Sequence, residues 1–224
     1  TDLSGRHQPD ITGLIGQYAH GNEPSHNFAY LYNYAGKPWK TQNITRQIMD
    51  NLYNTGRDGL PGNEDCGQMS AWYVFSALGF YPVTPGEDIY VLGTPIFDEA
   101  TINMQNGNSF TIRAGGASSE NRYIQEASLN GTSLHQSYLP HSTIISGGEL
   151  NLKMGDRPNQ NWAADHSKRP VSAMNLDIVA NPVFDYKERG FLDTMTVSIS
   201  TPTPGVAIHY TIDGSKPSVT SPIY

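Results

Sequence analysis

The sequence is poor in cysteine, in basic residues and in long apolar runs, and each shortage excludes a class of protein. Its single cysteine, Cys66, excludes an internal disulfide framework and any zinc site built from several cysteines. No run of 18 apolar residues is present, so the sequence predicts no transmembrane segment. Only 14 residues are lysine or arginine, against 21 aspartates and glutamates, and the net charge is −7. Because nucleic-acid sites depend on clustered Lys and Arg, we expect no nucleic-acid partner.

Polarity is carried mainly by uncharged residues. Charged residues make up 16% of the 224 residues and hydrophobic residues 37%, both low for a globular domain, whereas the 13 tyrosines are many. These aromatics argue against disorder and suit β-structure and carbohydrate-binding surfaces. An acidic chain of this kind favours divalent cations or neutral, hydroxyl-rich ligands. The length permits one large domain or two smaller ones, each able to bury a core.

The first part of the chain has the periodicity of helices. Apolar residues recur at positions i, i+3, i+4 and i+7 over residues 28–35, which predicts a helix with one buried apolar side. Pro24 and Gly36 are the expected start and end of this helix. The same period predicts a second helix over residues 41–54.

A third helix is predicted to begin near Cys66 and to end at Gly79, with Trp72 on its apolar side. Because Cys66 falls inside this apolar pattern, we expect it to be a small buried side chain rather than a reactive thiol.

From about residue 86 the hydrophobic period becomes two, which is typical of strands. The predicted strands are residues 89–92, 100–104, 109–113, 123–127 and 149–152. Asn106-Gly107, Asn130-Gly131 and Gly147-Gly148 predict hairpin turns between them. Turns spaced about ten to twelve residues apart indicate an antiparallel sandwich.

Residues 155–170 have neither period and indicate a closing loop or linker, after which segments 195–200 and 207–212 predict strands of a small separate β-module. The predicted fold class is therefore α+β. We expect helices over residues 1–85, an antiparallel β domain over 86–168 and a partial β-module over 169–224.

Two loops bring acids and amides to predicted helix starts. The first is residues 20–26, His-Gly-Asn-Glu-Pro-Ser-His, where Glu23 stands next to a helix N-terminus whose dipole favours the ionised carboxylate. A carboxylate beside the amide oxygen of Asn22 is a fragment of an oxygen-only calcium site. The alternative is that Asn22 and Glu23 merely cap the helix.

The second loop is residues 58–72, in which Asp58, Glu64 and Asp65 lie among turn-forming Gly and Pro residues. Asp65 is placed to cap the third helix, where its carboxyl group would have a low pKa and stay deprotonated, as a general base acting on water requires. The alternative is that Asp65 is an ordinary N-cap with no catalytic role. Spacing alone leaves both interpretations open.

These loops, with three further segments, closely resemble glycoside hydrolase family 92. The matching segments are residues 16–26, 30–36, 40–42, 62–73 (Gly-Asn-Glu-Asp-Cys-Gly-Gln-Met-Ser-Ala-Trp-Tyr) and 154–159 (Met-Gly-Asp-Arg-Pro-Asn). They agree in order and spacing, and the resemblance covers about residues 1–165. Members of this family are calcium-dependent, exo-acting α-mannosidases, many of them from gut Bacteroides-like bacteria.

The resemblance implies a catalytic module built as an (α/α)6 barrel, of which the three predicted helices would be the last. It also implies hydrolysis of terminal α-mannosides with inversion, in which two carboxylates roughly 6.5–9.5 Å apart admit a water. By motif position Asp65 corresponds to the general base, and Glu64 is a second catalytic candidate beside it. Asn63, expected to bind substrate, departs from relatives that carry Asp at this position.

The resemblance places the calcium segment in the first loop, with Glu23, Gln17 and Asn22 as expected Ca²⁺ ligands. The bound metal would contact the 2- and 3-hydroxyls of mannose and help to distort its ring. His20 and Asn22 are expected to bind substrate. Asn27 stands where many relatives have His.

The family's general acid belongs to a part of the barrel upstream of Thr1, so the expectation is that this chain is the C-terminal piece of a larger enzyme and is inactive alone. Its expected partners are mannose-containing glycans and the missing N-terminal part, and its expected location is the bacterial periplasm or cell surface.

The tail, residues 197–217, resembles the small chitobiase/hexosaminidase C-terminal-type β-module, which accompanies glycosidases. A function of a different class also stays open: the chain could be a carbohydrate-binding or structural module with no chemistry of its own.

Overall fold

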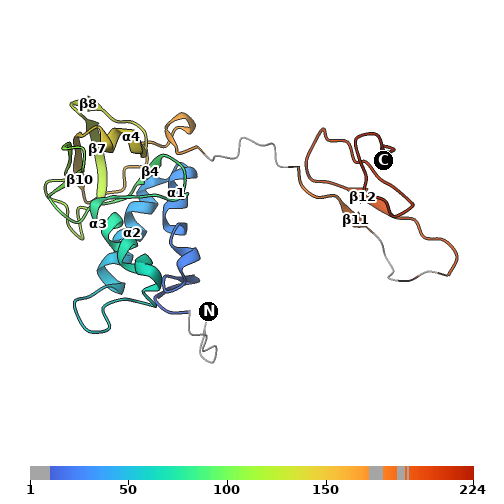
Figure 1. Ribbon diagram of the computed structural model, residues 1–224, viewed down its shortest axis with the longest axis horizontal. Coiled ribbons are helices and arrows are strands. Elements are labelled where there is room, and N and C mark those ends of the chain that lie inside the picture. The colour runs from blue at the N-terminus through green and yellow to red at the C-terminus, as the bar shows by residue number, and fades with distance from the viewer. Residues whose placement is uncertain (1–10, 172–178, 186–189, 191) are drawn as a thin grey trace. The chain divides into compact units, whose positions relative to one another are not determined.

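The computed structural model describes residues 11–171, 179–185, 190 and 192–224. They belong to two compact units, Thr1–Ala173 and Met174–Tyr224 (Figure 1). The boundary between the units lies close to the one predicted between residues 168 and 169. The division predicted between residues 85 and 86 falls inside the first unit, where a strand that follows the helices pairs with the first strand of the β region.

The first unit opens with short elements that lead into helices. In chain order they are β1 (Leu14–Ile15), β2 (Tyr18–Ala19), the 3-10 turns η1 (Glu23–Ser25) and η2 (Phe28–Tyr30), α1 (Leu31–Tyr34), α2 (Pro38–Leu52), the 3-10 turn η3 (Asp65–Gly67) and α3 (Gln68–Leu78). Three predicted helical regions are therefore confirmed. Gly79 ends α3 with a φ of 94°, a left-handed conformation that glycine adopts without strain. Within the described residues, no helix is long and apolar enough to cross a bilayer.

Two sequence-based expectations about these helices are wrong. The apolar side chains of Phe28, Leu31 and Tyr32 are 55%, 44% and 40% exposed, whereas Tyr30 and Asn33 are fully buried. The segment starts as a 3-10 turn with three residues per turn, so Tyr30 and Asn33, three residues apart, share the side that faces the core. Cys66, expected to be buried, is exposed in the turn before α3.

Two sheets follow the helices. The first contains β3 (Phe80–Tyr81), β4 (Ile89–Leu92) and β9 (Tyr138–Pro140) in the order β3-β4-β9. The second has the order β5-β6-β10-β7-β8. Its strands are β5 (Glu99–Asn103), β6 (Ser109–Arg113), β7 (Tyr123–Leu129), β8 (Thr132–Ser133) and β10 (Gly148–Gly155). The short helices α4 (His141–Ile145) and η4 (His166–Lys168) lie in the connections.

The β region is mixed rather than purely antiparallel as predicted, because β10 pairs parallel with β6. Asn106-Gly107 and Asn130-Gly131 do form hairpin turns, between β5 and β6 and between β7 and β8. Gly147-Gly148 is not a hairpin turn, since it joins α4 to β10. The α+β class is confirmed.

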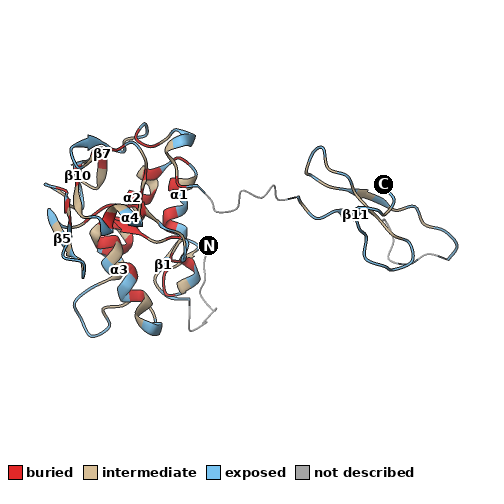
Figure 2. Ribbon diagram, turned by 45° about the horizontal axis from the view of Figure 1, so that its top comes forward, coloured by how far each residue is buried: buried red, intermediate tan, exposed pale blue. Residues whose placement is uncertain are grey.

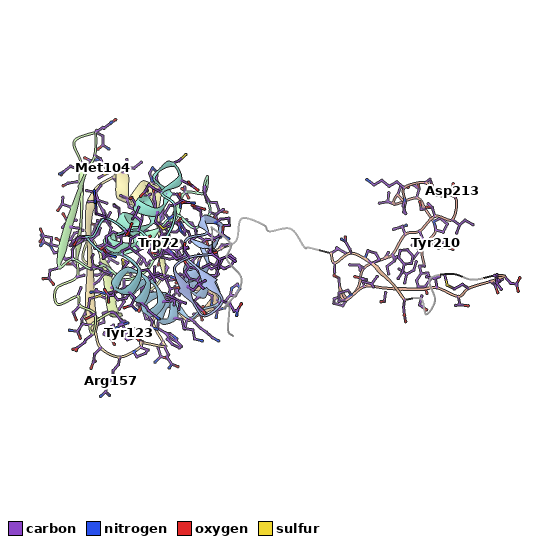
Figure 3. The ribbon with its side chains drawn as sticks, turned by 90° about the horizontal axis from the view of Figure 1, so that it is seen from below. Trp72, Met104, Tyr123, Arg157, Tyr210 and Asp213 are labelled. Carbon is purple, nitrogen blue, oxygen red and sulfur yellow. The ribbon has the colours of Figure 1, made fainter. Side chains whose placement is uncertain are left out.

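The β region and the helical region of the first unit each have an apolar core. Side chains from both sheets share one cluster that includes Phe80, Leu92, Phe110 and Leu150. The helices pack around a second cluster centred on Trp72, which lies inside this unit (Figure 3). This second cluster supports the two loops singled out in the sequence.

Among its described residues, the second unit has the antiparallel strand pair β11 (Val183–Asp185) and β12 (Ser198–Ser200). The strand predicted over residues 207–212 is reduced to an isolated bridge between His209 and Ile223. None of the described residues of this unit is buried, in contrast to the first unit (Figure 2).

Candidate active site

The two residues expected to act on substrate and metal occupy equivalent local positions. Glu23 opens η1, and the N–H of His26 donates to the Glu23 carbonyl oxygen at 2.9 Å. Asp65 opens η3, and the N–H of Gln68 donates to the Asp65 carbonyl oxygen. Each acidic residue therefore begins a single 3-10 turn that is closed by the residue three positions later.

The side chains that close the two turns are hydrogen-bonded to each other. Gln68 Nε2 donates to His26 Nδ1 at 3.2 Å and to the Tyr81 hydroxyl at 3.1 Å. His26 Nε2 lies 3.0 Å from the His20 carbonyl oxygen, which can only accept, so Nε2 carries the hydrogen and Nδ1 accepts. Burial lowers the pKa of His26, in keeping with this neutral tautomer.

Trp72 contacts both His26 and His20. Its indole Nε1 donates to the His26 carbonyl oxygen at 3.0 Å, and its ring meets the His20 ring edge-on at a centroid distance of 4.4 Å. The His20 and His26 rings stack at 4.6 Å. His26 is therefore a buried packing residue of the first loop.

His20 opens the first loop and packs among aromatic side chains, and its expected role in binding substrate stays a prediction. It is fully buried, and Tyr18 donates its hydroxyl to Nδ1 at 2.6 Å. Tyr53 gives its own hydrogen to the Met69 carbonyl oxygen, so it accepts from His20 Nε2 at 2.6 Å. Burial, with His26 beside it, lowers the pKa of His20 to about 3.

The two loops touch through glycine backbones. A Cβ built on Gly62 would lie 2.6 Å from the Gly21 Cα, and one on Gly21 would lie 3.0 Å from the Pro61 carbonyl oxygen. Real Cβ atoms do not approach backbone so closely, so only glycine permits this contact. The loops that carry Glu23 and Asp65 therefore lie directly against each other.

Glu64, and not Asp65, caps α3. Glu64 Oε1 accepts from the Ser70 N–H at 3.1 Å, and Oε2 accepts from the Ser70 hydroxyl at 2.7 Å. The interpretation of Asp65 as the N-cap is therefore wrong. The Asp65 side chain is exposed, and it makes no side-chain hydrogen bond to any residue that the structure describes.

The turn after Asp65 has a strained backbone. Cys66 has a φ of 56° and Gly67 a φ of 81°, so two consecutive residues are left-handed. A left-handed non-glycine residue costs about 1–3 kcal/mol and is typical of functional sites. Asn63, the other expected ligand-binding residue of this loop, is also exposed.

The first loop offers oxygen atoms that suit a hard cation. Glu23 Oε1 and Asn27 Oδ1 are buried and have no hydrogen-bond partner among the residues that the structure describes. Unpaired buried oxygens are costly, and a bound cation would satisfy them. Asn22 and Gln17 are exposed nearby in sequence. Because the described residues hold no group of three or more His, Cys, Asp or Glu side chains placed to bind a metal, the site would combine one carboxylate with amide oxygens and water.

Sequence reasoning missed the roles of Gln68, Tyr53 and Tyr81. Gln68 lies inside a motif that the sequence analysis singled out, but nothing in its spacing shows that it meets His26, 42 residues away. Tyr53 and Tyr81 carry no motif at all. Their buried hydroxyls become visible as partners only once the helices are packed.

The exposed Asp65 side chain, which no described residue binds, thus lies in a strained turn of the loop that packs against the Glu23 loop. The chain belongs to glycoside hydrolase family 92: the model of the glycosyl hydrolase family 92 catalytic domain matches residues 2–156. The chitobiase/beta-hexosaminidase C-terminal domain matches residues 188–224. Both resemblances found in the sequence are thereby confirmed.

Solved structures agree with this assignment. The chain is similar to the family GH92 α-mannosidase BT3965 of Bacteroides thetaiotaomicron, with 44% identity and a TM-score of 0.71, over 73% of this chain and 22% of that one. It is also similar to the inverting mannosidase BT2199 of the same organism, with 48% identity and a TM-score of 0.67, over 70% and 21% of the two chains.

A fungal relative is an uncharacterized secreted glycosidase of Arthroderma benhamiae, 33% identical over 155 residues, which are 68% of this chain and 20% of the relative. The chain therefore spans about a fifth of the length of the relatives it matches.

Proposed function

We propose that this chain supplies the general base and the metal-binding carboxylate of an exo-acting α-mannosidase that hydrolyses terminal α-mannosides with inversion. Asp65 is the base and Glu23 the metal ligand. Membership of family 92 supports glycosidase chemistry, and the similarity to an inverting mannosidase supports the stereochemical course. The observation that carries the proposal is that Glu64 takes the helix cap and leaves Asp65 exposed, with no described residue bound to its carboxylate.

In this proposal the Asp65 carboxylate accepts a proton from the water that attacks the anomeric carbon. Asn63 and Asn22, exposed on the two loops, bind sugar hydroxyls. Glu23, with Gln17 and Asn22, would hold Ca²⁺, and the bound ion would supply a positive charge that orients the sugar hydroxyls and favours a distorted ring. The orphaned oxygens of Glu23 and Asn27 support this placement of the cation.

In this proposal the rest of the barrel and the general acid belong to a part of the enzyme outside the 224 residues. Because the chain spans about a fifth of its relatives, we propose that α1 to α3 are the last helices of an (α/α)6 barrel and that the general acid comes from further sequence of the same enzyme. The substrates are mannose-containing glycans. The secreted relative supports an extracellular or periplasmic location, and we propose a bacterial source.

The stereochemistry of the product tests the proposal. The complete enzyme is mixed with an aryl α-mannoside, and proton NMR follows the anomeric signal of the first sugar released. We expect β-mannose to appear first and to mutarotate later, and we expect no turnover by the 224-residue chain alone. Release of α-mannose, or hydrolysis by the chain alone, would contradict the inverting mechanism or the assignment of the acid to other sequence.

One observation favours a second candidate function, that of a carbohydrate-binding module. The second unit has a concave site of about 610 Å³ whose lining includes Phe184, Tyr210 and Tyr224. Aromatic rings are suited to stacking on sugars. Calorimetry with mannose on the chain with and without residues 174–224 separates the two functions: binding that disappears with this deletion supports the module, whereas binding that depends on Asp65 or Glu23 supports the catalytic site.

A further inference from the structure

We propose that His26 and Gln68 are positioning residues that together set the separation between Glu23 and Asp65. This inference rests on the proposed function, because it concerns the two residues to which that function assigns the metal and the base. It adds a reason why the two loops keep a fixed relative placement. Neither side chain is assigned any contact with substrate.

The turns that begin at Glu23 and at Asp65 have the same internal geometry. Glu23 lies three residues before His26, and Asp65 lies three residues before Gln68. In each turn the backbone N–H of the later residue bonds to the carbonyl oxygen of the acidic one. The 3.2 Å bond between Gln68 Nε2 and His26 Nδ1 therefore joins two short, internally bonded turns at matching points.

Three contacts hold His26 in place, so it can fix the position of the second turn through Gln68. Its Nε2 donates to the His20 carbonyl oxygen and closes the base of the first loop. Its own carbonyl oxygen accepts from the Trp72 indole, and its ring stacks on that of His20. At 2% exposure it is shielded from any ligand, so an effect of His26 on the reaction must act through its neighbours.

Gln68 is the second partner in the hydrogen bond that joins the two turns, and its position requires a hydrogen-bond donor. Its amide nitrogen uses both hydrogens, one toward His26 Nδ1 and one toward the Tyr81 hydroxyl. A residue at position 68 must therefore donate to a neutral imidazole. A carboxylate there would face the His26 Nδ1 lone pair, and the two groups could bond only if one of them took up a proton.

The first test is kinetic and uses the complete enzyme. Gln68→Met removes both donors at similar volume, and Ser76→Ala serves as the matched control, because it removes another buried hydrogen bond from α3, the 2.8 Å contact to Tyr30. We expect Gln68→Met to lower kcat roughly 10–100-fold with a smaller change in KM, as a base displaced by about 1 Å does. We expect Ser76→Ala to cost stability without this loss of kcat. Equal kcat in the two variants would overturn the inference.

The second test needs no activity and is independent of the proposed function. In the ¹⁵N-histidine-labelled 224-residue chain at pH 7, long-range proton–nitrogen correlations are expected to show His26 as the neutral Nε2–H tautomer. In Gln68→Glu we expect the His26 Nδ1 signal to shift, because a carboxyl group replaces the amide N–H that donates to this nitrogen. An unchanged His26 spectrum in Gln68→Glu would show that the side chains are not coupled and would overturn the inference even where Gln68→Met fails to fold.

The two proposals fail in different ways. If Asp65→Asn keeps full mannosidase activity, the assignment of the base is wrong. If Asp65→Asn abolishes activity while Gln68→Met retains it and the His26 spectrum of Gln68→Glu is unchanged, only the positioning role is wrong.

Discussion

Glu64 binds Ser70 through both carboxylate oxygens, at 3.1 Å to the backbone N–H and 2.7 Å to the hydroxyl. The contact satisfies a backbone N–H in the first turn of α3, whose N-cap residue Gly67 has no side chain that could do so. Two adjacent acidic residues therefore have different tasks. Glu64 holds the start of the helix, and Asp65 presents its carboxylate to solvent.

This division of tasks predicts opposite results for two substitutions at position 64. Glu64→Ala removes the cap and should lower the free energy of unfolding by about 0.5–2 kcal/mol in urea denaturation. Glu64→Gln keeps an oxygen that accepts from the Ser70 N–H, so it should retain stability and leave kcat within a few-fold of the original. A loss of more than about 100-fold in kcat for Glu64→Gln, at unchanged stability, would mean that Glu64 takes part in proton transfer.

The orphaned oxygen of Glu23 predicts calcium-dependent stability. Excess Ca²⁺ should raise the melting temperature of the 224-residue chain, and a chelator should reverse the rise; at a concentration 100 times Kd the gain is about 2.7 kcal/mol. Glu23→Ala should abolish the response. Glu87→Ala is the matched control, because Glu87 lies outside the loop and also has a buried Oε1 to which no described residue bonds. Loss of the response in both variants, or in neither, would count against the site.

The buried histidines predict acid destabilisation below neutral pH. The pKa of His20 is lowered from 6.5 in the unfolded chain to about 3, so between these values the unfolded state binds more protons than the folded state. The contribution of neutral His20 to the free energy of unfolding is complete above pH 6.5. It declines as the pH falls, by about 1.4 kcal/mol per pH unit. The pKa of His26 is also lowered by burial, so His26 likewise makes the folded state less stable as the pH falls.

Urea denaturation between pH 7.5 and 5 measures this slope. His20→Gln should unfold with a visibly shallower dependence on pH, since its side chain does not titrate. An identical slope in His20→Gln would show that other groups account for the acid sensitivity.

The glycine contact between the loops predicts a steric effect at position 62. Gly62→Ala places a methyl group 2.6 Å from the Gly21 Cα and should lower the free energy of unfolding by about 1–3 kcal/mol, as overpacking does. Gly115→Ala is the control, because a Cβ there meets nothing within 4 Å. If both variants unfold at the same denaturant concentration, the loops are not packed as tightly as the structure has them.

The sequence was a good guide wherever local chemistry decides the structure. Gly79 ends its helix as predicted because only glycine enters the left-handed conformation freely, and Asn130-Gly131 forms its hairpin with φ of 49° and 80° for the same reason. The motif around Asp65 identified the family without any knowledge of packing. These features depend on a few neighbouring residues.

The sequence was a poor guide wherever distant residues decide it. The burial of residues 28–35 depends on a 3-10 start that their apolar period does not reveal, and the parallel pairing of β6 with β10 depends on the route of the chain through α4. The competition between Glu64 and Asp65 for the helix cap is set by the left-handed turn at Cys66 and Gly67. The bridge from His26 to Gln68 appears only when two loops meet.

The most direct test of the account compares two aspartates of one loop in the complete enzyme. Asp65 and Asp58 are both exposed, and Asp→Asn changes either one by a single charge. With an aryl α-mannoside, Asp65→Asn should lower kcat by roughly 10²–10⁴-fold, as loss of a general base does, while Asp58→Asn should leave it within a few-fold. Equal activity of the two variants would contradict the assignment of Asp65 as the base.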